Sequence, residues 1–482
     1  MQNATHLESG FNPPGGATVA LPALVHADRP GALKHLHCAL GLLVGLTLTT
    51  GIGVAQTQQL DLNKPVHPAG GPPVKFAILA DPHLYEKRLG TSGPAFEAYL
   101  AQDPKLLALS EAILDSAFRS ILAQRVKFVI IVGDLTKDGE IQSHVLMANR
   151  LAWLEQRGVQ VFVVPGNHDM NNPDARSFHG DTTRPVPSAS VRSFKAIYHR
   201  FGYGQALDHA PDSLSYVAEP VRGLWLLALD STDTAANQTL GHPRVGGRLT
   251  PATLDWALAK IQQARSRGKW VIPFMHHGVN PNFLAEPQFF GEYLVDDWPL
   301  IGATLAAANI KVIFTGHYHA QDAAWPLDAN YQPIPGSLLD VATASLCGWP
   351  CAYRIATLTA GGELSIRSQR VTEISAPTGG LPFQDYAAAF LAARLPALAT
   401  AQLMAAFQLS QEQAAQLAPL VVGALMAQYA GDEVTPPDVA ALIATWMGSP
   451  DPLEQTLGMA LHALWTDLPP ADNEVNLSLA TP

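Results

Sequence analysis

Six short apolar runs, most of them ending directly in aspartate, glycine or histidine, constrain this 482-residue chain more than any other feature. The runs are residues 74–80, 127–132, 159–164, 224–229, 270–275 and 311–314. They are almost continuously apolar, which is typical of strands covered on both faces. Amphipathic stretches separate them, and in residues 249–264 Thr250 is the expected N-cap with Pro251 at the first helical position. Alternating strands and helices predict a layered α/β core.

The composition excludes several classes of protein. Hydrophobic residues make up 48% of the chain and charged residues 15%, so the chain can bury a sizeable core and is not globally disordered. The net charge of −11 argues against a protein that holds a long nucleic acid by bulk electrostatics. If such a chain binds phosphate, local cations or metal ions must do so.

The N-terminal segment has the sequence features of a secretory signal peptide. An uncharged apolar stretch follows Arg29 and Lys34 and ends at the small residues 53–55. We therefore expect residues 1–55 to be a signal peptide and the remainder to be periplasmic or secreted. The alternative is an uncleaved anchor, and in either case the segment could associate transiently with a membrane.

The cysteines are too few for a disulfide scaffold or a four-cysteine zinc site. Removal of residues 1–55 would also remove Cys38 and leave Cys347 and Cys351. In an oxidising compartment we expect this pair to form a small disulfide loop, and the alternative is two free thiols.

The chain changes character towards its C-terminus. Residues 338–344, 352–358 and 363–368 are predicted to be antiparallel strands, with a hairpin turn at residues 361–362. Residues 383–467 are rich in Ala, Leu and Gln and predict a small helical bundle without a chemical motif. We place a catalytic domain at 72–376 and an all-α domain at 381–470, and expect the last dozen residues to be a loose tail.

Polar side chains follow five of the predicted strands. They are Asp81-Pro82-His83, Gly133-Asp134, Gly166-Asn167-His168-Asp169, His276-His277-Gly278 and Gly316-His317-Tyr318-His319. Loops at the carboxyl ends of strands in an α/β sheet converge on one edge, so we expect these groups to meet. Carboxylates with imidazoles suit Mn, Fe, Zn or Co, and one carboxylate can bridge two such ions.

These five blocks, in this order, resemble the calcineurin-like metallophosphoesterase superfamily over residues 74–370. The resemblance implies a layered β-sandwich flanked by helices and two metal ions from among Mn²⁺, Fe²⁺/Fe³⁺ and Zn²⁺. It implies a first metal bound by Asp81, His83, Asp134 and His319, and a second bound by Asp134, Asn167, His276 and His317. His168 would stand beside the metals as a catalytic residue, and Asp169 would orient it.

Within the superfamily the chain is most similar to bacterial class III cyclic-nucleotide phosphodiesterases with an added C-terminal helical domain. The segments that carry this similarity are ILADPHLY, VGDLTKDGE, VPGNHDM and the insert at 89–103. Many relatives have Pro after the His-His pair, whereas this chain has Gly278. This departure leaves open which histidine is the ligand; we choose His276, which directly follows the strand, and His277 could face the substrate.

The predicted function is hydrolysis of small phosphodiesters of the cyclic-nucleotide type. A hydroxide that bridges the two metals would attack phosphorus, and His168 would assist the leaving group. The alternatives are a broad-specificity phosphomonoesterase, a nuclease, which the charge opposes, and a cell-envelope binding protein with a structural metal site.

Other polar residues are weaker candidates. Arg176, His179 and Arg184 are expected in a solvated loop, and His242 and Arg244 could equally contact phosphate or solvent. His144 and His199 are expected on helix surfaces, and Trp225, Trp256 and Trp270 in the core.

Overall fold

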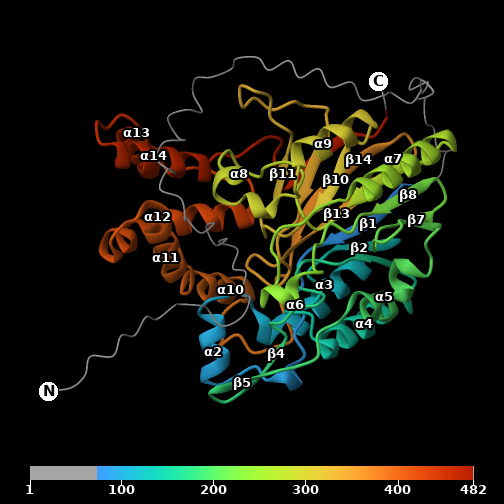
Figure 1. Ribbon diagram of the computed structural model, residues 1–482, viewed down its shortest axis with the longest axis horizontal. Coiled ribbons are helices and arrows are strands. Elements are labelled where there is room, and N and C mark those ends of the chain that lie inside the picture. The colour runs from blue at the N-terminus through green and yellow to red at the C-terminus, as the bar shows by residue number, and fades with distance from the viewer. Residues whose placement is uncertain (1–72, 481–482) are drawn as a thin grey trace.

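The computed structural model describes residues 73–480, which form two sheets packed face to face with helices on their outer sides (Figure 1). The predicted targeting segment 1–55, with Cys38, lies outside the described residues. The α/β sandwich flanked by helices is therefore confirmed.

The first sheet has the strand order β15-β14-β13-β1-β2-β3. Its strands are β1 (Val74–Leu79), β2 (Phe128–Val132), β3 (Gln160–Val164), β13 (Ala352–Leu358), β14 (Glu363–Arg370) and β15 (Glu474–Ser478). β1, β2 and β3 run parallel, and β13 joins them antiparallel to β1. The predicted hairpin of β13 and β14 is confirmed.

The second sheet has the order β11-β12-β10-β9-β8-β7-β6. Its strands are β6 (Asp208–His209), β7 (Tyr216–Val221), β8 (Leu224–Ala228), β9 (Trp270–Phe274), β10 (Val312–Thr315), β11 (Asp322–Ala324) and β12 (Leu339–Ala342). β12 pairs parallel with β10 and antiparallel with β11. The prediction of antiparallel strands is therefore only partly right for 338–344, whose strand β12 lies in the second sheet between β11 and β10.

Burial on both faces explains why the strand sequences are continuously apolar. In β8, Leu226 packs into the core between the sheets, whereas Trp225 and Leu227 pack outwards. The outer side of this sheet is covered by α7 (Pro251–Ser266) and α9 (Trp298–Ala307). Each strand therefore needs apolar side chains at consecutive positions.

Helix α7 begins where its sequence predicts. Thr250 caps it by accepting the backbone N–H of Thr253, and Pro251 occupies the first turn. On the other side of the sandwich, α3 (Ser110–Ala123) and α4 (Ile141–Glu155) pack on the first sheet. Shorter elements are η1 (Lys87–Leu89), α2 (Pro94–Leu100), η2 (Leu107–Leu109), the hairpin β4 (Arg176–His179) and β5 (Thr182–Pro185), α5 (Val191–Ile197), η3 (His199–Tyr203), α6 (Asn237–Leu240), α8 (Glu286–Phe289) and η4 (Gly291–Tyr293).

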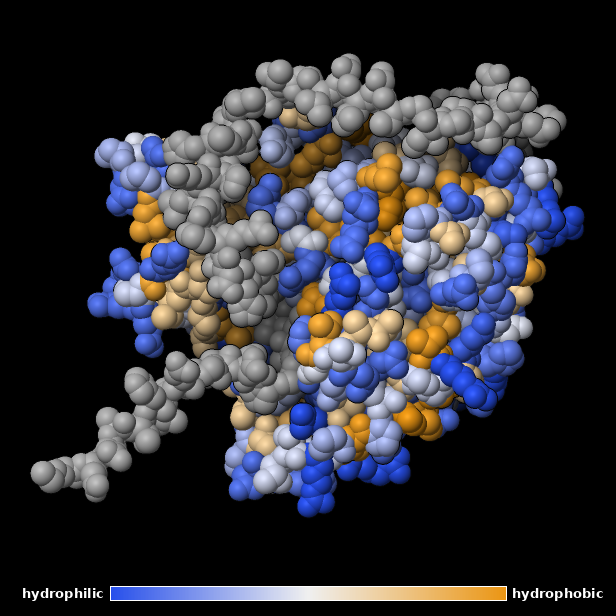
Figure 2. Space-filling model, viewed as in Figure 1, coloured by the Kyte–Doolittle hydropathy of each residue, from blue (hydrophilic) through white to orange (hydrophobic). Residues whose placement is uncertain are grey.

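The C-terminal helical region is confirmed as five helices within the described residues. They are α10 (Phe383–Ala392), α11 (Leu395–Phe407), α12 (Gln411–Ala430), α13 (Pro437–Met447) and α14 (Pro452–Leu464). By length and composition, 383–407 could cross a membrane, but it is divided between two helices, and helices of soluble proteins pass the same test. Figure 2 shows apolar side chains among hydrophilic ones on this region, where Met404 and Met447 are exposed.

The end of the chain is not a loose tail. Residues 474–478 form β15, an edge strand that pairs antiparallel with β14. Val475 is buried and Leu477 half-buried, while the residues between and beside them are exposed. This alternation is the pattern of a strand with one buried face, so the chain returns to the first sheet after its helical region.

The expected disulfide was also wrong. Cys347 and Cys351 are free thiols, and both lie in the hydrophobic core between the sheets. Burial raises the pKa of each thiol, which keeps it neutral and unreactive. Trp225 and Trp270 are core residues as predicted, and Trp256, on α7, is half-buried and packs against the apolar cluster on the outer side of the second sheet.

Candidate metal centre

The carboxyl ends of five strands bring the predicted polar blocks to one edge of the sandwich. β1 leads to Asp81 and His83, β2 to Asp134, β3 to Asn167 and His168, β9 to His276, and β10 to His317 and His319. Five of these side chains stand on residues with positive φ, from 39° to 70°: Asp81, His83, Asp134, His317 and His319. Non-glycine residues rarely adopt this conformation, and such strain concentrates at functional sites.

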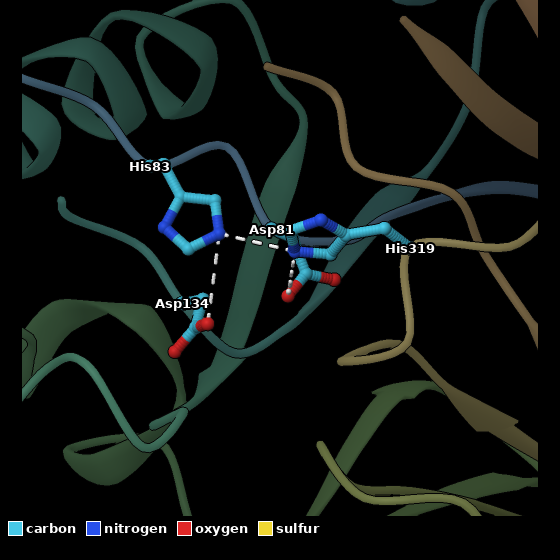
Figure 3. A group of neighbouring side chains, drawn as sticks. All are labelled: Asp81, His83, Asp134 and His319. Carbon is cyan, nitrogen blue, oxygen red and sulfur yellow. Dashed lines mark hydrogen bonds and ion pairs between the residues drawn. The ribbon is translucent and has the colours of Figure 1, made fainter. Parts of the chain in front are cut away.

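A first group of ligand-type atoms comes from Asp81, His83, Asp134 and His319. One atom from each lies within 4.8 Å of those of the others. Nε2 of His83 lies 3.2 Å from Nε2 of His319 and 3.6 Å from Oδ2 of Asp134. Figure 3 shows the two rings and the two carboxylates turned towards one small space, although they come from three strands.

A second group shares Asp134 with the first. Its other members are His276 and His317, again with ligand atoms within 4.8 Å of one another. Nε2 of His276 lies 3.5 Å from Oδ1 of Asp134 and 3.1 Å from Oδ1 of Asn167. Asp134 therefore stands where a bridging carboxylate would be needed, and all seven predicted ligands lie in or beside the two groups.

The glycines before the ligands allow this close packing. A Cβ atom at Gly133 would collide with the ring of His276, and one at Gly316 with the carboxylate of Asp81. Gly133 also has a φ of 99°. Side chains at these positions would displace the ligands, so the glycines are required by the site.

The arrangement fits bound cations. Oδ1 of Asp81 and Nε2 of His317, two atoms that can give a lone pair to a metal, are buried and have no hydrogen-bond partner among the described residues. Burial lowers the pKa of His83 and His317 well below the usual range, which leaves the neutral imidazoles that metals bind. Unpaired buried polar atoms are costly, and two metal ions shared by Asp134 would supply the missing partners.

The two adjacent histidines have different roles. Nδ1–H of His276 donates to the carbonyl of Val132 at 2.8 Å, which leaves Nε2 directed at Asp134 and Asn167. Both ring nitrogens of His277 are engaged, with Ser231 Oγ at 2.7 Å and the Val245 carbonyl at 2.9 Å. The geometry therefore favours His276 as the ligand and makes His277 a support rather than a substrate contact.

The partner of His168 is not the residue that the sequence indicated. Nδ1 of His168 lies 2.8 Å from Oδ1 of Asp138, and both residues are buried. The carboxylate of Asp169 accepts hydrogen bonds from the backbone N–H groups of Leu135, Thr136 and Gly166. Asp169 thus holds the ligand loops together, and the orienting role predicted for it belongs to Asp138.

The prediction that His144 lies on a helix surface was also wrong. It is fully buried on α4, with Nε2 2.8 Å from the carbonyl of Asp169 and Nδ1 2.8 Å from the hydroxyl of Tyr198. Burial lowers the pKa of His144 to about 4. It supports the Asn167–Asp169 loop from behind, whereas His199 is exposed as expected.

A cavity beside His319 contains residues that sequence reasoning missed. It is lined by Asp103, Pro104, Lys105, His319, Ser345, Gly348, Trp349, Leu391 and Tyr429. Lys105 is buried, and its Nζ lies 3.3 Å from Oδ2 of Asp103. The insert at 89–103 ends two residues before this lysine, and that position was the only available signal. Leu391 and Tyr429 show that α10 and α12 form part of the wall.

The helical region also reaches the metal-ligand loop. The hydroxyl of Tyr318, between His317 and His319, donates to Oε1 of Gln428 on α12 at 3.0 Å. The backbone N–H of Gln321 donates to the carbonyl of Gln428 at 3.1 Å. The ring of Tyr293, in η4, stacks on the ring of His317 in this loop, with ring centroids 4.5 Å apart.

The other arginines and histidines that the sequence singled out lie outside the two ligand groups, and some of them are paired with other residues. Arg244 is paired with Asp233 at 2.7 Å, and its loop packs against His277 through Val245. His242 beside it is exposed. Arg176, His179 and Arg184 lie in the β4–β5 hairpin, where the last two are exposed.

Two solved structures are similar to this chain at low sequence identity. A dimetal phosphatase from Danio rerio is 14% identical, covers 63% of this chain and 98% of its own, and has a TM-score of 0.43. A purple acid phosphatase from yellow lupin (Lupinus luteus) seeds is 12% identical, covers 63% of this chain and 53% of its own, and has a TM-score of 0.38. No curated protein matches this chain in sequence.

The sequence of this chain also matches the profile of a protein family. The calcineurin-like phosphoesterase profile matches residues 74–321, just over half of the chain. The matched range includes both groups of ligand atoms. With its two ligand groups joined by Asp134, the chain belongs to the calcineurin-like phosphoesterases, a family of dinuclear metal-dependent hydrolases.

Proposed function

We propose that this chain hydrolyses small phosphodiesters of the cyclic-nucleotide type. The observation that carries phosphoester chemistry is the pair of buried ligand groups that share Asp134, with His168 next to them. Two cations bound there would supply positive charge to the phosphoryl oxygens and lower the pKa of the attacking water.

His168 would act on the leaving group. Its Nε2 lies 3.9 Å from Oδ2 of Asp134, on the side of the ring opposite Asp138. Burial is the main reason that its pKa is lowered, to about 4, so the ring is neutral without substrate, and the negative charge of a bound phosphoester would favour the protonated form that donates to a departing alkoxide. The Asp138 carboxylate keeps Nδ1 paired and so holds the ring in place during this transfer.

The cavity beside His319 supports a diester rather than a monoester. Its lining contains one cation, Lys105, and that cation is already paired with Asp103. Beyond the two metal ions, this lining therefore offers no unpaired cation, which suits the single negative charge of a phosphodiester better than the two charges of a monoester.

The test compares bis-p-nitrophenyl phosphate with p-nitrophenyl phosphate on the manganese-loaded chain. We expect the diester to have the higher kcat/KM, and faster turnover of the monoester would replace this proposal by a phosphomonoesterase. A manganese-loaded protein that cleaves neither compound would favour the binding protein. Cyclic nucleotides in the same assay then define the natural class.

We further propose an extracytoplasmic location. The support for it is the sequence of residues 1–55, which lies outside the described residues. Expression in a bacterial host followed by cell fractionation and N-terminal sequencing tests it. We expect a mature chain that starts after Ala55 outside the cytoplasm, and a full-length cytoplasmic product would contradict the location.

A further inference from the structure

A second cluster of carboxylates lies where the helical region meets the second sheet. Asp322 is the first residue of β11, Glu433 lies between α12 and α13, and Asp472 precedes β15. One oxygen from each lies within 4.8 Å of those of the others. A more exposed group of Asp432 and Asp467 shares Asp472. Three chain segments thus bring negative charge to one place.

The inner carboxylates lack partners. Oδ1 of Asp322 and both carboxylate oxygens of Glu433 are buried and accept no hydrogen bond from another described residue. Asp322 is 3% exposed and Glu433 9%. Asp472 is held in place, since its two oxygens accept the backbone N–H groups of Ala323 at 2.9 Å and Asp432 at 2.6 Å. Buried acceptors without donors are rare and call for a missing partner.

Arg354 does not pair directly with these carboxylates. Its guanidinium is fully buried and donates to the backbone carbonyls of Asp322 and Asp472, at 2.9 and 2.5 Å, and to that of Ala342. Burial and mutual repulsion raise the pKa of Glu433 to about 7 and that of Asp472 to about 8. The charge of Arg354 offsets only part of this repulsion, so the ionised cluster gains from a further cation.

We propose that Asp322, Glu433 and Asp472 bind a calcium-type divalent cation that ties the helical region and β15 to the second sheet. Two features of the catalytic centre recur here: ligand atoms within 4.8 Å of one another and buried acceptors without partners. The donors differ, because this cluster offers only oxygen. Hard cations such as Ca²⁺ prefer carboxylate and carbonyl oxygens, whereas imidazoles favour transition metals.

The position gives this cation a structural role. Asp322 follows His319 by three residues, and Gln321 between them is bonded to Gln428 of α12. A cation at Asp322 would hold the end of the ligand loop, the α12–α13 connection and the start of β15 together. Its binding would therefore stabilise the fold without contact with the substrate.

The experiment uses the full chain with His83→Ala and His317→Ala, so that each catalytic group lacks an imidazole. The protein is stripped with EDTA, dialysed and titrated with CaCl2 by calorimetry and by thermal unfolding. We expect one Ca²⁺ per chain and a melting temperature that rises with Ca²⁺ concentration. The unsubstituted chain, stripped in the same way, is titrated in parallel to show the same stabilisation.

Glu433→Gln in that background is the decisive variant. We expect its Ca²⁺ affinity to fall by about tenfold or more, because a ligand charge is lost. In EDTA it should melt above its parent, since repulsion is relieved. Glu454→Gln, exposed on α14, is the matched control and should bind Ca²⁺ like the parent.

Three results would overturn the proposal. The first is a calorimetric titration without heat of binding and a melting temperature that does not change at millimolar Ca²⁺. The second is a Glu433→Gln variant that binds Ca²⁺ as tightly as its parent. The third is a Glu433→Gln variant that melts at a higher temperature than its parent while Ca²⁺ changes the melting temperature of neither protein. The last would show a cluster of protonated carboxyls. If circular dichroism shows that Glu433→Gln does not fold, Asp322→Asn replaces it with the same expected and contrary outcomes.

Discussion

The carboxylate of Asp138 lies 2.8 Å from Nδ1 of His168 and fixes the ring that faces the shared carboxylate, Asp134. Asp138 is itself held by Lys137, whose ammonium pairs with its other oxygen. Lys137 and Asp138 lie in the loop after β2, and Asp138 contacts His168 in the loop after β3. It orients the ring from residues that do not belong to either ligand group.

Asp138→Asn should therefore lower kcat while both metals stay bound. We expect a loss of about 10- to 100-fold, the range found when a group behind a functional histidine is removed. The loss should be larger for poor leaving groups than for p-nitrophenolate, because His168 assists departure. Asp169→Asn is the comparison, and it should lower the melting temperature without this leaving-group dependence.

His168→Ala should keep the metals and lose most turnover. Removal of a general acid typically costs about 10²- to 10⁴-fold in rate. Elemental analysis and kcat with bis-p-nitrophenyl phosphate are measured on the same preparation. Loss of both metals in this variant would make His168 a ligand and contradict the assigned role.

His276→Gln and His277→Gln form a matched pair. We expect His276→Gln to lose the second metal, since Nε2 of His276 points at Asp134. His277→Gln should keep its metal content and lose stability, because the side chain bonds Ser231 and Val245. Metal content by mass spectrometry and melting temperature separate the two, and the reverse result would exchange their roles.

Gln428→Ala tests whether α12 supports the ligand loop. It would leave the buried hydroxyl of Tyr318 without its acceptor, at a cost of about 1–3 kcal/mol. We expect weaker metal binding in a competition with chelator and a lower melting temperature. Gln416→Ala, exposed on the same helix, is the control. Equal metal affinity in the two variants would show that the helical region does not support the site.

Lys105→Met tests the cation in the cavity beside His319. If Lys105 holds substrate phosphate, KM should rise by about tenfold while kcat and metal content change little, because a ground-state charge contact is lost. Lys105→Arg should recover part of the affinity. A large fall in kcat with unchanged KM would instead assign the residue to the chemical step.

Much of the metal centre is determined by the sequence alone. Apolar runs covered on both faces locate β1, β2, β3, β9 and β10, and the ligands follow because loops at parallel strand ends share an edge. The start of α7 is equally local, since Thr250 and Pro251 act on the first turn of their own helix.

Only the tertiary structure decided which residues pair. Asp138 and Asp169 are both carboxylates in ligand loops, and their distance from one ring depends on how two loops cross. His144 is buried because Tyr198 and Asp169 close over it. The hydrophobic pattern of the sequence indicates which residues are buried and whether a segment is a helix or a strand. Hydrogen-bond partners, in contrast, are set by residues that lie far apart in the chain. For the same reason, the return of β15 to the first sheet and the contact of Gln428 with Tyr318 became visible only in the fold.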